Sequence, residues 1–283
     1  MKLTMTDARV ISVVTTSAGI AGRLRAAPSD AGRVQSVFEH ALNLDWHDGR
    51  LVTLHGPGPL LAPFAAALTH FPTGAVRPGQ VVRRRDDTIT IDGVVVEWSD
   101  TATVDVTMPA TSAERQSATA LLSMLPDVES VSPGLTSTVG RRAESRLAEG
   151  LRLRQSVLFI AGALGLLGLG EGLTPSGDDC LVGALAVVHR FARSWLDAHP
   201  EIEAVVRTAS ITATNAIARE FVTHALAGQF SEPLIDLMSA QAASDLGRAV
   251  THVLSMGATS GVDTLHGIRL ALHALRNHGT TSA

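Results

Sequence analysis

The sequence predicts an α+β protein: an N-terminal, mainly antiparallel β part that can close as a barrel, followed by an all-helical C-terminal part. Up to about residue 108, short segments rich in β-branched residues alternate with turn residues. After Pro109, the segments are longer and carry helix-start and helix-stop residues. The chain has 283 residues, 45% of them hydrophobic, which is enough for two buried cores. We therefore expect a β-rich domain of residues 1–109, a helical domain of residues 110–276 and a disordered tail of residues 277–283.

Turn residues separate the expected strands. Asp92-Gly93 is typical of a two-residue hairpin turn, and His47-Asp48-Gly49 is typical of a turn leading into residues 51–55. One short helix is expected at residues 60–69, between two segments that contain glycine and proline. The expected strands are residues 9–16, 34–46, 51–55, 81–85, 88–91, 94–98 and 103–107.

Helix signals fill the rest of the chain. Residues 112–125 start after a Thr-Ser cap and stop before Pro126, and a Ser/Pro/Gly-rich connection follows at residues 128–135. Residues 137–169 comprise a charged helix and then an apolar one. Further helices are expected at residues 177–198, 201–227, 232–238, 240–255 and 261–273.

Composition excludes several classes of function. The net charge of −4 gives no overall basic field, so nucleic acid is a poor default partner. Cys180 is the single cysteine, which rules out an intramolecular disulfide and a multi-cysteine zinc cluster. Lys2 is the only lysine, which argues against a Schiff-base lysine and against a P-loop. The sequence has no tyrosine to act as an acid or a nucleophile.

Nothing in the sequence resembles a membrane or export segment. The first 14 residues lack the charged start, long apolar stretch and cleavage site of a signal peptide. The most apolar run, residues 157–170, is shorter than the roughly 18–20 residues of a membrane span and contains glycines. We expect a cytoplasmic protein without a membrane partner.

A glycine-rich segment carries the strongest chemical signal. Residues 168–179 read Gly-Leu-Gly-Glu-Gly-Leu-Thr-Pro-Ser-Gly-Asp-Asp and lie between two expected helices. Thr174 or Ser176 can cap the second helix, and Ser176 with Asp179 has the spacing of a capping box. Acidic residues in a first helical turn are favoured by about 0.3–1 kcal/mol without any function. However, one carboxylate is enough for a cap, whereas Asp178 and Asp179 lie about 100° apart on a helix and so have different tasks.

The same pattern occurs a second time. Residues 176–183 and 260–267 both follow Ser-Gly-x-Asp-x-Leu-x-Gly. Because Gly183 and Gly267 have no side chain, the two helices can pack backbone against backbone, which makes their N-termini neighbours. Paired helix N-termini offer N–H groups and hydroxyls to an anion, and the aspartates could hold Mg²⁺ or orient an amide. The alternative interpretation is that two ordinary helix starts have similar sequences by coincidence and share no function. Glu220 and His224, four residues apart, are a weaker candidate for a proton relay or metal pair.

These residues resemble a known bacterial family. Residues 170–179, followed by Leu181-Val-Gly183, are similar to the hallmark of the family typified by the AllH protein of allantoin catabolism. Residues 257–263 and 227–234 support the resemblance, which extends more weakly into the β part. Family members commonly have proline where this sequence has Glu171, which adds a charge to the loop.

The resemblance implies a subunit of an oxamate carbamoyltransferase. This activity moves a carbamoyl group between oxamate and phosphate, which links oxalurate and carbamoyl phosphate in purine-ureide catabolism. Expected partners are an FdrA-like protein and another carbamoyltransferase subunit, and oligomer formation is open. Two alternatives are a Mg-nucleotide-dependent carboxylase or ligase, for which no nucleotide motif is present, and a non-catalytic assembly or ligand-sensing subunit.

Residues and resemblance together give the expected site. We expect catalysis to depend on backbone and hydroxyl contacts to a small anion, with no covalent catalyst. The expected catalytic residues are Asp178, Asp179 and Asp263, of which Asp178 and Asp179 are also the candidate Mg²⁺ ligands. The expected anion-binding residues are Gly170, Gly172, Thr174, Ser176, Gly177, Asn215, Thr259, Ser260 and Gly261.

Overall fold

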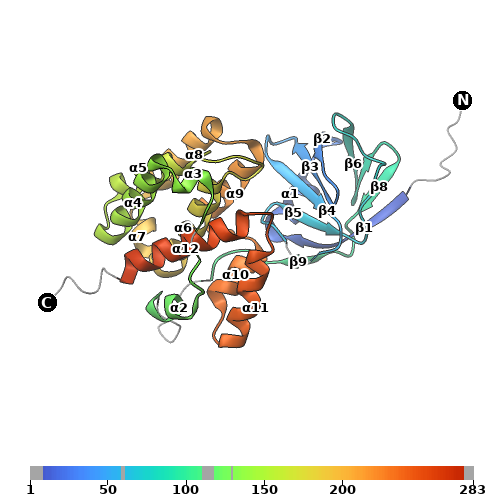
Figure 1. Cartoon of the computed structure of the whole chain (residues 1–283). Helices are drawn as coiled ribbons and strands as arrows, with labels where there is room; N and C mark the ends of the chain where they lie inside the picture. The colour runs from blue at the N-terminus through green and yellow to red at the C-terminus, as the bar shows by residue number, and fades with distance from the viewer. Residues whose placement is uncertain (1–8, 59–60, 110–117, 129, 277–283) are drawn as a thin grey trace, which may run out of the picture. The chain divides into compact units, whose positions relative to one another are not determined.

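The computed structural model describes residues 9–58, 61–109, 118–128 and 130–276, which form two compact units that divide near Val106. Two predicted segments lie wholly or partly outside the described residues: the first turns of the helix expected at 112–125, of which residues 112–117 are not described, and the tail expected at 277–283. The α+β class is confirmed, because the first unit is a barrel-like sheet and the second is helical (Figure 1).

The first unit is a closed sheet of mixed direction. Its neighbours follow the order β5-β4-β3-β2-β6-β7-β8-β1, and a further β1–β5 pairing closes the barrel. Six of these pairings are antiparallel, whereas β4–β5 and β1–β8 are parallel. β9 pairs with β1 beyond the end of β8. The strands are Arg9–Ser17 (β1), Asp30–Val37 (β2), Ala41–Trp46 (β3), Leu51–His55 (β4), Ala65–Leu68 (β5), Val81–Arg85 (β6), Thr88–Ile91 (β7), Val94–Glu97 (β8) and Ala102–Val104 (β9).

Alternating side chains give this unit its own core. In β1, Ile11 and Val13 are buried while Val10 and Val14 are exposed, as expected for a strand with one buried face. The predicted Asp92-Gly93 turn is confirmed between β7 and β8, where both residues have positive φ. His47-Asp48-Gly49 connects β3 to β4, as predicted.

Two predictions in this unit are wrong, and one helix was not predicted. The helix predicted at residues 60–69 is replaced by β5, because this short segment pairs with β4 on one edge and β1 on the other. The single strand predicted at residues 34–46 is two antiparallel strands, β2 and β3. The helix Ala18–Ala26 (α1) was not predicted; it buries Ile20 and Leu24, although its two glycines weaken the sequence signal.

The second unit is helical, and α6 lies at its centre. Every residue of α6 from Ser176 to Arg190 is buried, as expected for a helix surrounded by other elements. The helices are Ala118–Met124 (α2), Pro133–Thr136 (α3), Thr138–Leu153 (α4), Ser156–Leu166 (α5), Ser176–Phe191 (α6), Arg193–Asp197 (α7), Pro200–Ala213 (α8), Ala216–Leu226 (α9), Glu232–Ser239 (α10), Ala243–Leu254 (α11) and Ser260–Arg276 (α12).

Two predicted helices are interrupted. The helix predicted at residues 177–198 is α6 and α7, which are separated at Ala192, and the helix predicted at residues 201–227 is α8 and α9, which are separated at Thr214 and Asn215. Asn215 caps α9 by accepting hydrogen bonds from the amides of Ile217 and Ala218 at 3.0 and 3.1 Å. The second interruption places Thr214 and Asn215 beside the glycine-rich loop.

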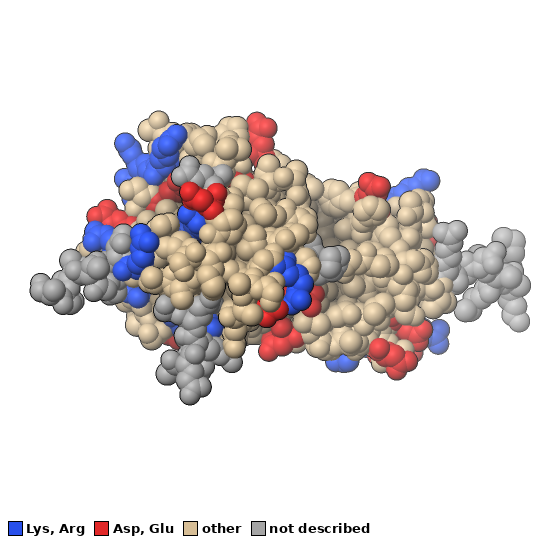
Figure 2. Space-filling view, turned by 60° about the horizontal axis from the view of Figure 1, so that its bottom comes forward, with Lys and Arg blue, Asp and Glu red and all other residues tan. Residues whose placement is uncertain are grey.

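The surface shows no single dominant charge on the face displayed. Figure 2 shows basic and acidic side chains interspersed among uncharged ones on that face. Within the described residues, no helix is both long enough and apolar enough to span a membrane.

Candidate functional site

The glycine-rich loop between α5 and α6 is folded against the α8–α9 junction. Gly168, Gly170 and Gly172 all have positive φ, which confirms the tightly turning backbone that the sequence predicted. A side chain at Gly168 would place a Cβ atom 1.9 Å from the carbonyl oxygen of Ala213. Gly170 and Gly172 are exposed, and the carbonyl of Gly172 lies 3.5 Å from the side-chain nitrogen of Asn215.

Asp178 holds this loop in place. Its side chain is 1% exposed and accepts hydrogen bonds from the amide of Gly168 at 3.1 and 3.2 Å and from the Thr214 hydroxyl at 2.6 Å. Burial raises the pKa of Asp178 to about 6, although the two hydrogen bonds oppose the shift. Because both oxygens have internal donors, Asp178 fixes the loop against the α8–α9 junction. Its expected catalytic and metal-binding roles stay predictions.

The two helices that carry the repeated motif pack backbone against backbone. A Cβ atom at Gly183 would lie 2.1 Å from the carbonyl oxygen of Thr264, and one at Gly267 would lie 2.0 Å from that of Cys180. Cys180 and Thr264 occupy matching positions of the two motifs, so the contact between α6 and α12 is nearly symmetric. The close approach that the two glycines predicted is present in the structure.

A second pair of glycines has equivalent surroundings at the helix starts. A Cβ atom at Gly177 would lie 2.1 Å from the carbonyl oxygen of Leu166, and one at Gly261 would lie 2.0 Å from that of Val253. Both carbonyls belong to the ends of the preceding helices, α5 and α11. The two copies of the repeated motif therefore pack against their preceding helices in the same way.

This packing occupies the amides that were expected to bind an anion. The amide of Gly177 donates to the carbonyl of Leu169 at 2.8 Å, and that of Gly261 donates to the carbonyl of Met256 at 2.9 Å. Gly177 and Gly261 therefore do not offer these N–H groups to a ligand. The prediction that Thr174 or Ser176 caps α6 is wrong: the N-cap is Pro175, whose carbonyl accepts from the amides of Asp178 and Asp179, and no side chain caps the helix.

Hydroxyl groups from the two motifs meet at the outer end of the helix pair. Thr174 Oγ1 and Ser260 Oγ are hydrogen-bonded at 2.7 Å, and both residues are half-buried. Thr259, next to Ser260, is exposed. The predicted proximity of the two motifs is thus present at Thr174 and Ser260.

Asp179 lies beneath this hydroxyl pair and is incompletely satisfied. Its side chain is 8% exposed, and Oδ2 has no hydrogen-bond partner among the described residues. Burial raises the pKa of Asp179 well above its ordinary value; hydrogen bonds from the Ser260 and Thr174 hydroxyls lower it, and the nearby Asp263 and Asp178 raise it further. A buried carboxyl oxygen without a donor destabilises the fold, so a polar ligand that supplies one would be bound favourably.

Asp263, the matching aspartate of α12, has its donors inside the protein. It is 0% exposed, and its carboxylate accepts hydrogen bonds from the hydroxyls of Ser130 and Ser132. These two serines precede α3. Asp263 therefore fixes the segment before α3 against α12, which makes it a positioning residue beside Asp179.

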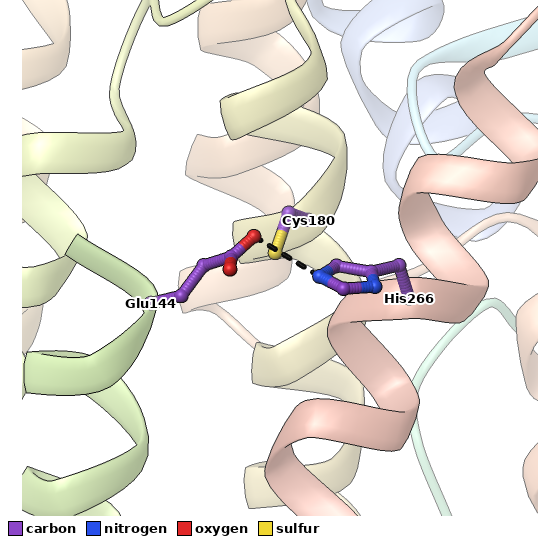
Figure 3. A group of neighbouring side chains, drawn as sticks. All are labelled: Glu144, Cys180 and His266. Carbon is purple, nitrogen blue, oxygen red and sulfur yellow. Dashed lines mark hydrogen bonds and ion pairs between the residues drawn. The ribbon is translucent and has the colours of Figure 1, made fainter. Parts of the chain in front are cut away.

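The two aspartates expected to bind Mg²⁺ have different hydrogen-bond partners: Asp178 accepts from the Thr214 hydroxyl, and Asp179 from the Ser260 hydroxyl. Their binding of a metal stays a prediction. Among the described residues, three metal-ligand atoms converge at Glu144, Cys180 and His266, which come from α4, α6 and α12 (Figure 3).

Two family models match the chain. One is described as oxamate carbamoyltransferase subunit AllH and covers residues 166–272, and the other is described as AllH family N-terminal domain and covers residues 10–105. The chain belongs to the AllH family. This confirms the resemblance found in the sequence. No solved structure matches the chain.

The AllH family description indicates a carbamoyltransferase subunit, and the word subunit indicates that it acts in a complex with other proteins. Both copies of the repeated motif lie within the AllH match at residues 166–272. Ser130, Ser132 and Glu144 lie outside both matched segments and were not found by sequence reasoning. No pattern in the sequence connects them to the motifs, because their contacts arise only from tertiary packing.

Proposed function

We propose that this AllH family member is the subunit of an oxamate carbamoyltransferase that holds the carbamoyl group, with Thr174, Asp179 and Ser260 as its contacts. The reaction would join oxalurate and phosphate to oxamate and carbamoyl phosphate in purine-ureide catabolism in the cytoplasm. In that direction, the carbamoyl carbon loses its bond to the oxamate nitrogen, which takes a proton, and gains a bond to a phosphate oxygen.

The observation that carries this proposal is Oδ2 of Asp179, which lies beneath the Thr174–Ser260 pair and has no hydrogen-bond partner in the part of the chain that the structure describes. A carbamoyl group has an NH₂ donor and a carbonyl acceptor in one plane. Its NH₂ can donate to the Asp179 carboxyl group, and its oxygen can accept from a hydroxyl of Thr174 or Ser260 once the bond between the two hydroxyls opens. Such contacts fix the orientation of the reacting carbon, which is the main contribution expected where no covalent catalyst operates.

The amides of Gly177 and Gly261 are already hydrogen-bonded within the protein, which changes the group that the site is expected to bind. Without those donors, the paired helix starts suit the amide end of a substrate better than a phosphate group. The family match favours carbamoyl transfer over the carboxylase or ligase alternative. A ligand-sensing role of the same site remains as an outcome of the test.

Ligand-induced stabilisation of the purified chain tests the proposal. We expect oxamate or carbamoyl phosphate, at about 100 times its dissociation constant, to stabilise the protein by roughly 2.7 kcal/mol, which thermal unfolding detects easily. Phosphate alone and ATP with Mg²⁺ should have little effect. The isosteric Asp179→Asn variant should lose the stabilisation, because the amide NH₂ that replaces Oδ2 is a donor and would face the NH₂ of the carbamoyl group.

Asp236→Asn is the matched control, because Asp236 is exposed on α10. It should respond to ligand as the unmodified chain does. Stabilisation of Asp179→Asn equal to that of the control would contradict the assigned site. Stabilisation without any effect of Asp179→Asn on turnover of the complex reconstituted with its partner subunits would favour ligand sensing over catalysis.

A further inference from the structure

Three side chains with different ligand atoms converge beside the aspartates of the repeated motif. Glu144 on α4, Cys180 on α6 and His266 on α12 each offer one ligand atom, and these atoms all lie within 4.8 Å of one another. Figure 3 shows the side chains pointing toward a common point from three helices, with the sulfur beside the line that joins the carboxylate and the imidazole. The distance from His266 Nε2 to Glu144 Oε1 is 3.0 Å.

The backbone fixes this arrangement. Gly267 packs directly against the main chain of Cys180, which brings the neighbouring His266 to the thiol. On the other side of the imidazole, the amide of Ser130 lies 3.3 Å from Nδ1, so Nε2 is the nitrogen that faces Glu144 and Cys180. The cluster is therefore held by main-chain packing of α6 against α12, independently of the hydroxyl pair at Thr174.

The surroundings carry negative charge. Cys180 is fully buried, and the carboxylates of Glu144, Asp263 and Asp179 all act on it electrostatically. A cation bound among these groups would compensate for charge that is otherwise unfavourable in the interior. Glu144 and His266 keep 14% and 20% of their side chains exposed, so two of the three ligand residues reach the surface.

We propose that Glu144, Cys180 and His266 bind one Zn²⁺ ion. Thiolate, imidazole and carboxylate are the three ligand types that zinc takes in proteins, whereas Mg²⁺ prefers oxygen ligands only. Ligand atoms of a tetrahedral zinc site lie roughly 3.3–3.8 Å apart, given metal–ligand bonds of about 2.0–2.3 Å. Here Nε2 and Oε1 are 3.0 Å apart and all three ligand atoms lie within 4.8 Å of one another, so side-chain movements of about 1 Å reach this geometry. Three protein ligands leave a fourth position open, as in zinc sites that act on a substrate.

Binding changes the protonation of the ligands in a defined way. The Cys180 thiol releases its proton and binds as a thiolate, and Glu144 binds as a carboxylate. The proton of His266 moves from Nε2 to Nδ1, so the Ser130 amide, which donates to Nδ1 at 3.3 Å, has to turn away from the imidazole. One proton is therefore released for each ion bound. The site does not depend on the proposed carbamoyl contacts, so either assignment can fail without the other.

Metal content and cobalt spectroscopy test the proposal. The chain purified without chelators should contain about one zinc per molecule by mass spectrometry. After removal of zinc, added Co²⁺ should give a thiolate-to-cobalt charge-transfer band in the near ultraviolet. Cys180→Ala should abolish the band, and Glu144→Gln or His266→Gln should weaken zinc affinity by about 100-fold or more, since loss of an outer partner alone costs up to that factor.

His40→Gln is the control, because His40 pairs with Glu39 on the exposed surface of the other unit without a thiol nearby. It should bind zinc and cobalt as the unmodified chain does. Circular dichroism checks that each variant is folded. A chain that takes up neither zinc nor cobalt, or a cobalt spectrum without a thiolate band in the unmodified chain, would overturn the proposal even if every variant failed to fold.

Discussion

Asp178 and Asp179 are adjacent in the sequence and differ in what surrounds them. Asp178 accepts hydrogen bonds from Gly168 and Thr214, whereas Asp179 leaves Oδ2 without a donor among the described residues. Both side chains are buried. Substitutions of the two residues should therefore differ in their effect on the free energy of unfolding because of these donors and not because of packing. The same substitution at each position can thus distinguish a residue that stabilises the fold from a residue that binds a ligand.

We expect Asp178→Ala to lower the free energy of unfolding by about 2 kcal/mol more than Asp179→Ala. In the first variant, the Gly168 amide and the Thr214 hydroxyl lose their acceptor, and a buried donor left unsatisfied costs about 1–3 kcal/mol. In the second variant, the Thr174 and Ser260 hydroxyls still bond each other. Urea unfolding of both variants at pH 7 measures the difference. Equal losses would indicate that Asp179 is structural and would weaken the proposed carbamoyl site.

At the scale of elements, the α6–α12 pair depends on two glycines, Gly183 and Gly267. A methyl group at either position would lie about 2 Å from a carbonyl oxygen of the facing helix, so the helices would have to separate. A methyl group at Gly247 on α11 would instead meet no heavy atom of a neighbouring element within 4 Å, and this residue is exposed. Gly247 is therefore the control position: like Gly183 and Gly267 it is a glycine within a helix, but it does not pack against a described neighbouring element.

Gly183→Ala and Gly267→Ala should each lower the free energy of unfolding by about 3 kcal/mol or more, the upper range for overpacking. Gly247→Ala should raise it by about 0.5–1 kcal/mol, because alanine is the better helix former. Thermal unfolding of the three variants measures these changes. If Gly183→Ala resembled Gly247→Ala, the close contact of the two helices would be wrong.

The same elements show what the sequence predicts and what it does not. The glycines at 183 and 267 predicted the close helix pair, because only residues without a side chain permit that contact at matching positions. The segment containing β5 was predicted as a helix, since four residues such as Ala65–Leu68 do not reveal that two strands will pair with them. The Glu144, Ser130 and Ser132 contacts were likewise missed, because they join segments more than 120 residues apart from their partners on α12.

At the scale of the whole molecule, each unit has a hydrophobic core of its own. The core of the helical unit draws its buried residues from Met108 to Ala274. In the barrel, buried side chains of different strands, such as Leu44 on β3 and Ile89 on β7, are fully enclosed. A chain with two cores is expected to depart from a single cooperative unfolding transition.

We therefore expect calorimetry to resolve two unfolding transitions that respond to different substitutions. Leu44→Ala, in the barrel, and Leu185→Ala, on α6, each remove a side chain that is 0% exposed, which typically costs about 2–5 kcal/mol. Each variant should lower one transition and leave the other within about 0.5 kcal/mol, because substitutions in separate cores share no partner. One transition lowered by both variants would instead show that barrel and helices unfold together. The carbamoyl and zinc sites would then be stabilised by the barrel as well, although every residue assigned to them belongs to the helical unit.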